Sequence, residues 1–182
     1  MKKILFSVIL SFAIFICLSQ TSSDTIYPYS SSYTGYADYY GNKTTGDVKV
    51  GAANPPFITN RYRGFMKFSI PITIPNGSTI LGIELHFFLH YAGGNGYTLW
   101  IGSLLDDPMY SSGTYIYSAI GSGYTYYSNY LGMESTGWKT IYLNSTANYY
   151  FQNSISMGWW AVGLMEQGDD DAYATAYGYG GS

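Results

Sequence analysis

The stretch from Tyr110 to Tyr130 is the most aromatic part of the sequence and the first candidate for a functional surface. It holds seven tyrosines and three glycines. Each large aromatic brings roughly 150–250 Å² of surface, which is more than one short stretch can bury. An exposed aromatic patch marks an interaction surface for sugar rings or for protein assembly. The candidate ligand-binding residues are Trp100, Tyr115, Tyr117, Tyr124, Tyr126, Tyr127, Tyr130 and Trp138.

The densest acidic cluster is Asp169-Asp170-Asp171, with Glu166 just before it. Oxygen-rich loops of this kind can hold Ca²⁺, and Asp169 and Asp171 are the candidate ligands. The segment does not match an EF-hand, and three consecutive acids cannot all face one ion. A solvated turn is therefore the favoured interpretation, and no other cofactor is expected.

Glu84, His86 and His90 have the residue types of a metal site. On a strand, however, positions i, i+2 and i+4 span about 13 Å, so the three cannot close on one ion. The polar outer face of a half-buried strand explains them better. No Gly-x-Ser-x-Gly elbow or other catalytic constellation is found. The sequence therefore favours a protein that is not an enzyme.

Two segments carry the strongest strand pattern. Between Ile80 and Tyr91, apolar side chains alternate with polar ones, and Arg63 to Ile70 shows the same period of two. The turn signal Pro75-Asn76-Gly77 lies between them, so the two strands are expected to be neighbours in one sheet or across a sandwich. The predicted core residues are Met66, Phe68, Ile83, Leu85 and Phe87.

Weaker patterns complete the set of predicted elements. Trp159 to Met165 is expected to be buried on both faces, because both alternating sets are apolar. Short helical turns are predicted over 114–120, ending at Gly121, and over 145–153, after an N-cap at Asn144. The other predicted strands are Tyr36 to Tyr40, Val48 to Ala52, Tyr97 to Ile101, Trp138 to Leu143 and Ala172 to Tyr179.

The N-terminus has the order of a secretory signal peptide. Lys2 and Lys3 precede an apolar run from Ile4 to Leu18, and small residues follow. That run is too short to span a bilayer comfortably, so cleavage after Ser19 is expected, with Ser22 or Ser23 as alternatives. The mature chain then loses Cys17, the only cysteine, and keeps six basic against eleven acidic residues, a net charge of −5. Nucleic acid is an unfavourable partner for such a chain.

Composition favours one all-β domain. Charged residues make up only 10% and aromatics 19%, which argues against an acidic disordered chain and for a packed core. Glycine and asparagine clusters provide turns for short strands. We expect a single antiparallel β-sandwich over residues 25–182, with one or two short helical turns, preceded by the signal peptide at residues 1–19.

Several of these segments together resemble the DNRLRE-type domain. The similarity runs over Arg63-Gly-Phe-Met-Lys-Phe-Ser-Ile, Ile74-Pro-Asn-Gly-Ser-Thr-Ile and Ile83-Glu-Leu-His-Phe. It continues in Trp138-Lys-Thr-Ile-Tyr-Leu-Asn and Gly158-Trp-Trp-Ala-Val-Gly-Leu. The resemblance implies a jelly-roll-like sandwich on a secreted protein, and some members of that family bind acidic polysaccharides.

The resemblance also shapes the expected function. The first hypothesis is a secreted, non-catalytic module that binds polysaccharide at the cell surface or in the extracellular matrix. The second is a self-associating subunit of an extracellular filament or matrix, held by tyrosine-rich contacts and strand addition. The family continues into a further strand after the region of Tyr177, so the domain is expected to lack it and to leave an open sheet edge. Residues 25–30 are the candidate strand to fill that edge, within the molecule or in a neighbour.

Overall fold

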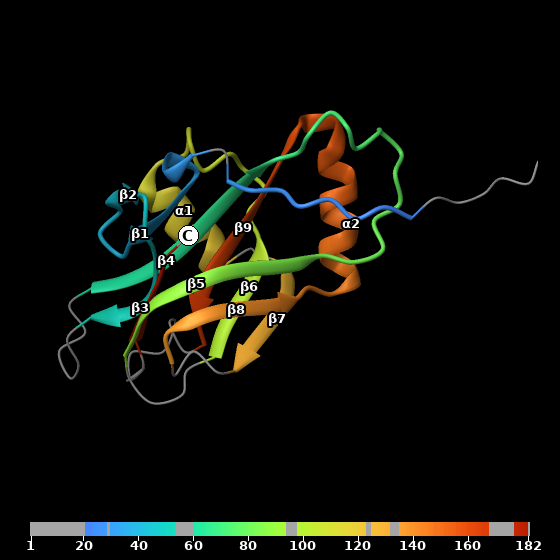
Figure 1. Cartoon of the computed structure of the whole chain (residues 1–182). Coiled ribbons are helices and arrows are strands. Elements are labelled where there is room, and N and C mark those ends of the chain that lie inside the picture. Colours follow the sequence, from blue (N-terminus) through green and yellow to red (C-terminus); the bar gives the residue numbers. More distant parts are fainter. Residues whose placement is uncertain are drawn as a thin grey trace, which may run out of the picture.

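The protein is built almost entirely from antiparallel strands (Figure 1). This computed structural model describes residues 21–28, 30–53, 60–93, 98–122, 125–131, 135–167 and 177–181. The strands are β1 (Thr34–Asp38), β2 (Lys43–Thr45), β3 (Val48–Ala53), β4 (Asn60–Ser69), β5 (Glu84–Gly93), β6 (Thr98–Ser103), β7 (Tyr126–Leu131), β8 (Gly137–Tyr142), β9 (Trp159–Glu166) and β10 (Tyr177–Gly181). Two helices, α1 (Gly113–Ser122) and α2 (Ser145–Ser154), complete the fold with two short 3₁₀ turns.

The strands form one strongly curved sheet in the order β7-β6-β9-β4-β3-β10-β5-β8; β1 also pairs with β4, and β2 pairs with β1. The two halves of the sheet face each other, and the main hydrophobic core fills the space between them. Leu85 of β5, Ile101 of β6 and Val162 of β9 all belong to this core. The expected all-β sandwich with two short helices is confirmed.

The alternation predicted along β5 sets its two faces. Leu85, Phe87 and Leu89 are buried in the main core, while Ile83 is half-buried against it. Tyr91 keeps the same phase but is 51% exposed, because it lies near the end of the strand, beyond these buried positions. Met66 and Phe68 of β4 are buried as predicted. β4 and β5 are not hydrogen-bonded partners, because β3 and β10 lie between them in the sheet order, but both strands contribute side chains to the main core.

The outer face of β4 and β9 is buried as well. Phe65, Ala161 and Met165 form a second apolar cluster with Ile116 and Ile120 of α1. β9 is therefore buried on both faces, as its double apolar pattern predicts. Close packing of α1 on the strand also requires glycine at position 163, since a Cβ there would lie 2.6 Å from Cγ1 of Ile120.

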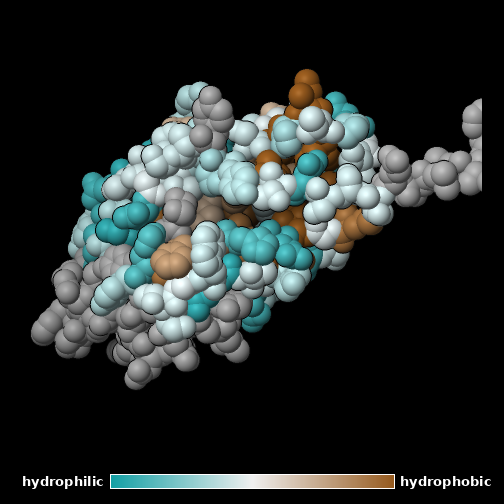
Figure 2. Space-filling model, viewed as in Figure 1, coloured by the Kyte–Doolittle hydropathy of each residue, from teal (hydrophilic) through white to brown (hydrophobic). Residues whose placement is uncertain are grey.

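Helix α2 covers one end of the sandwich. Asn144 is its N-cap, and the side-chain oxygen accepts hydrogen bonds from the backbone N–H groups of Thr146 (3.0 Å) and Ala147 (3.2 Å). Figure 2 shows hydrophobic surface gathered at this end, over α2 and the connection between β4 and β5. Ile72 and Leu81 of that connection are 99% and 74% exposed.

The predicted open edge at the C-terminal end is wrong. β10 pairs with β3 on one side and with β5 on the other, so it lies inside the sheet. Residues 21–28 contain no strand, although Ile26 packs on the main core. In the described part of the chain, the strands at the ends of the sheet order are β7 and β8. β7 and β2 were not predicted, and residues 172–176 of the predicted last strand lie outside the described residues.

No helix within the described residues is long and apolar enough to cross a membrane. The predicted signal peptide and its cleavage position lie outside these residues, so both stay predictions.

Candidate functional site

The outer side of β5 and β8 presents aromatic and polar side chains to solvent, and we call it the β5–β8 face. It is formed by Glu84, His86, Phe88 and His90 of β5 and by Trp138, Thr140 and Tyr142 of β8. Trp138 pairs with Phe88 in the register, and Tyr142 pairs with Glu84. Strands place alternate residues on one side, so the alternation that buries Leu85 and Ile141 turns this set outward. The surface over β5 and β8 is mostly pale to teal in Figure 2, with one tan, more hydrophobic group over β5.

Trp138 is the largest exposed aromatic group on this face. Its side chain is 76% exposed, and its ring meets Phe88 edge to face with centroids 5.5 Å apart. Phe88 in turn contacts the His90 ring at 5.0 Å. These contacts hold the indole in place while leaving much of its surface open, which is the arrangement that stacking on a ligand ring requires.

A polar trio of Glu84, His86 and Thr140 lies beside the indole. Nε2 of His86 is 3.1 Å from the Glu84 carboxylate, and Nδ1 is 3.0 Å from the Thr140 hydroxyl. Tyr142 lies four positions after Trp138, about 13 Å along a strand, and Thr140 lies between them. The face therefore combines two exposed rings with hydrogen-bonding groups.

The structure separates the predicted ligand-binding residues instead of gathering them in one patch. Trp138 belongs to the β5–β8 face. Trp100 of β6 and Tyr126 of β7 contact each other edge to face at 6.1 Å in the other half of the sheet. Tyr115 and Tyr117 lie on α1, where Tyr117 stacks under the Arg63 guanidinium at 4.0 Å.

Tyr127 is a core residue, and its predicted role at a ligand surface is wrong. It is 1% exposed and stacks on Trp160, with ring centroids 5.9 Å apart. Burial raises the pKa of its hydroxyl far above the ordinary value. Tyr124 lies outside the described residues, as does the side chain of Tyr130, whose backbone pairs with Leu99.

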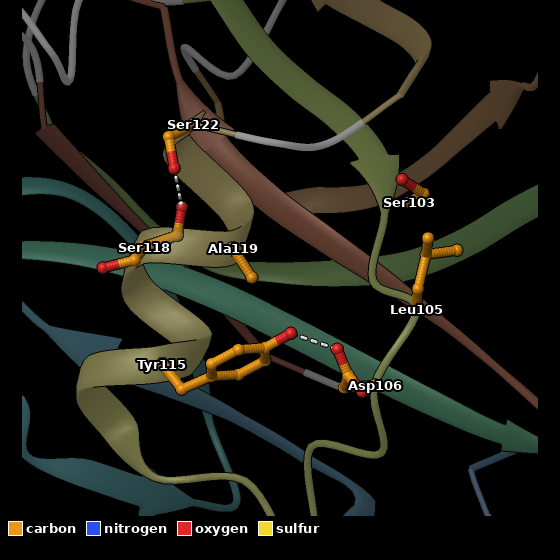
Figure 3. Close-up of a pocket in the computed structure, with 7 residues that line it drawn as sticks. All are labelled: Ser103, Leu105, Asp106, Tyr115, Ser118, Ala119 and Ser122. Atoms are coloured by element: carbon orange, nitrogen blue, oxygen red, sulfur yellow. Dashed lines mark hydrogen bonds between the residues drawn. The ribbon is translucent and has the colours of Figure 1, made fainter.

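Tyr115 borders a hollow between α1 and the segment that follows β6 (Figure 3). The hollow has a volume of about 270 Å³, and its lining includes Asp106, Ser103 and Ser122. The Tyr115 hydroxyl donates a hydrogen bond to Asp106, which raises the pKa of Tyr115. Pockets that enclose a small molecule usually measure roughly 300–1,000 Å³. The hollow is therefore a weaker candidate than the β5–β8 face for binding an extended chain.

The basic side chains are engaged inside the protein. Lys43 donates to the backbone carbonyls of Pro108, Met109 and Ser111 at 2.8–3.1 Å. Lys67 is buried and forms an ion pair with Asp107 at 2.6 Å.

The remaining four cations are also held by the fold. Arg63 is buried and donates to the Tyr117 carbonyl at 2.5 Å. Lys49 lies 4.7 Å from the centre of the Tyr36 ring, and Lys139 is buried with its ammonium 3.4 Å from Ser135. Arg61 has a partner as well. Each of the six basic residues beyond Lys3 thus has at least one contact within the protein.

The described residues contain no group of three or more His, Cys, Asp or Glu side chains placed to hold a metal ion. Nε2 of His86 lies 3.1 Å from the Glu84 carboxylate. The calcium hypothesis for Asp169 and Asp171 concerns residues outside the described part of the chain.

Phe88, Thr140 and Tyr142 were not predicted as binding residues, and His86 was considered only as a metal ligand. The signal was present in Phe88, an apolar residue in the otherwise polar outer set of the strand from Ile80 to Tyr91. The chain matches no protein family model, no curated protein and no solved structure.

Proposed function

We propose that this protein is a secreted, non-catalytic module that binds polysaccharide through the β5–β8 face. The observation that carries the proposal is the 76% exposed indole of Trp138 beside the polar trio on an outward sheet surface. Sugar rings present C–H groups that stack on an aromatic face, and their hydroxyls need nearby hydrogen-bonding partners. An open sheet surface suits an extended chain, whereas an enclosed pocket suits a small molecule.

The antiparallel sandwich is the architecture that the DNRLRE-type resemblance implies, and that resemblance supports the same proposal. The signal-peptide pattern at residues 1–19 supports a location at the cell surface or in the extracellular matrix.

Substitution of Trp138 tests the proposal. Trp138→Ala should weaken retention on a bound polysaccharide by about 10-fold or more, because buried tryptophan contacts at binding surfaces typically contribute about 2 kcal/mol. Affinity electrophoresis through gels that contain soluble polysaccharides measures the effect. Tyr110→Ala is the matched control, since Tyr110 is 90% exposed and lies outside the β5–β8 face. Equal retention of Trp138→Ala and the parent protein on every polysaccharide that the parent binds would reject this face.

A self-associating structural subunit is the second candidate function. In the described part of the chain β8 pairs only with β5, so its other edge carries backbone groups that can template another strand. Strand addition at such an edge is a general route to assembly. Negative-stain microscopy of the purified protein separates the two candidates, because filaments without polysaccharide binding would favour assembly.

A further inference from the structure

The hydrogen bonds inside the polar trio determine what the trio offers to a ligand. A carboxylate can only accept hydrogen bonds, so Nε2 of His86 carries the proton that it donates to Glu84. When the ring is neutral, Nδ1 is an acceptor, and it receives the hydroxyl proton of Thr140. The side chains of Glu84 and His86 are 48% and 55% exposed, so the trio is open to solvent.

The trio is left with acceptors and no spare donor. The second carboxylate oxygen of Glu84 and the lone pairs of the Thr140 oxygen remain available. Ligand groups that meet them must therefore donate hydrogen bonds. Hydroxyl groups do so, whereas ionised carboxylates and sulfates carry only acceptors.

The charges on the β5–β8 face also favour an uncharged ligand. Glu84 has the only formal charge among the outward residues described on β5 and β8. Lys139 of β8 is buried on the inner side of the sheet, opposite Phe87. The cations Lys67, Lys43, Lys49 and Arg63 contact Asp107, backbone carbonyls and tyrosine rings. An acidic chain on this face would place its charges near an unneutralised carboxylate.

We propose that the β5–β8 face takes an uncharged polysaccharide, with one sugar ring on Trp138 and neighbouring hydroxyls donating to Glu84 and Thr140. This inference rests on the proposed function and narrows its ligand class. It differs from the acidic polysaccharides that the family resemblance implies.

A panel of uncharged and acidic chains tests the ligand class. Residues 20–182 are run through affinity gels that contain hydroxyethylcellulose, xylan, galactomannan or laminarin, and through gels with alginate, polygalacturonate or hyaluronan. Runs at about 0.1 M and about 1 M salt reduce the screening length from about 10 Å to about 3 Å. We expect retention by at least one uncharged chain, with less than about a twofold change between the two salt concentrations.

Failure of the inference is distinct from failure of the proposed function. Retention by acidic chains alone, lost at high salt, would overturn the uncharged ligand class while leaving polysaccharide binding intact. Retention by none of the panel would count against the proposed function, and this inference would fall with it.

Two conservative variants test the role of the trio. Thr140→Val and Glu84→Gln should each weaken binding of the uncharged chain by about 2–10-fold, the effect of losing or distorting one hydrogen bond. Both side chains are exposed, so unfolding midpoints should match the parent protein. Tyr110→Ala again serves as the control. Unchanged affinity in both trio variants would overturn the assigned hydrogen bonds.

Discussion

The contact between Gly163 of β9 and Ile120 of α1 predicts that Gly163→Ala destabilises the parent protein but stabilises a variant that lacks the Ile120 side chain. A Cβ at position 163 would lie 2.6 Å from Cγ1 of Ile120 and 3.2 Å from both Cγ2 and Cδ1. Ordinary contacts of this kind begin near 3.4 Å. Gly163→Ala should therefore force α1 away from the sheet, and overpacking of this sort costs about 1–3 kcal/mol.

Removal of the Ile120 side chain should reverse that effect. Ile120 is fully buried, so Ile120→Ala alone should cost about 2–5 kcal/mol. All three clashing atoms are absent from the double variant, and the new methyl group fills part of the cavity. Alanine also fits a strand better than glycine by about 0.5–1 kcal/mol. The double variant should consequently be more stable than Ile120→Ala alone.

Urea denaturation followed by tryptophan fluorescence measures the free energy of unfolding of the parent protein, the two single variants and the double variant. The matched control is Gly82→Ala, because a Cβ at Gly82 meets nothing within 4 Å. That control should change the free energy of unfolding by less than about 0.5 kcal/mol. If the two single effects simply add within about 0.5 kcal/mol, α1 does not pack on β9 as described.

Three further outcomes are expected. Leu85→Ala should lower the free energy of unfolding by about 2–5 kcal/mol, because Leu85 is 4% exposed in the main core; an unchanged melting temperature would contradict this. Burial alone would raise the pKa of Asp38, but hydrogen bonds from Asn42, Asn60 and the Tyr40 backbone outweigh it and lower the pKa below 3.8. The ionised Asp38 thus stabilises the fold above the unfolded pKa, and this contribution disappears as the pH falls through the folded pKa. Asp38→Asn should lower the free energy of unfolding by about 1–3 kcal/mol at neutral pH. Urea titrations should show that the difference in stability between the parent protein and the variant shrinks as the pH becomes acidic; a difference independent of pH would refute the carboxylate's role. Intact mass of the exported protein should give an N-terminus near Gln20, and retention of residues 1–18 would exclude cleavage there.

The strands with a strict alternation could be predicted from sequence, because burial on one side leaves a period of two. Leu85 and Phe87 on one side of β5, with His86 on the other, follow from that rule. The period of two did not predict β7, because tyrosine occurs both in cores and on surfaces. Its register also shifts opposite Ile101 and Gly102, which breaks the period.

The candidate site was harder to predict because exposure depends on distant segments. Tyr126 and Tyr127 are adjacent and chemically identical, yet one is 42% exposed and the other 1%. Trp138 was identified as a candidate, but its register partner Phe88 lies 50 positions earlier in the sequence. The buried cations Arg63 and Lys67 carry no local sequence signal, since α1 and the segment around Asp107 supply their partners.

The central position of β10 governs the order in which the sheet can be completed. β10 (Tyr177–Gly181) is the only described strand that hydrogen-bonds to both β3 and β5. Before it docks, the described strands form two separate ladders, β7-β6-β9-β4-β3 and β5-β8. The pairing of β10 with β3 also closes a loop of more than a hundred residues, and such distant contacts form slowly. A nascent chain emerging from its N-terminus would thus remain without a continuous sheet until residues 177–181 had been made.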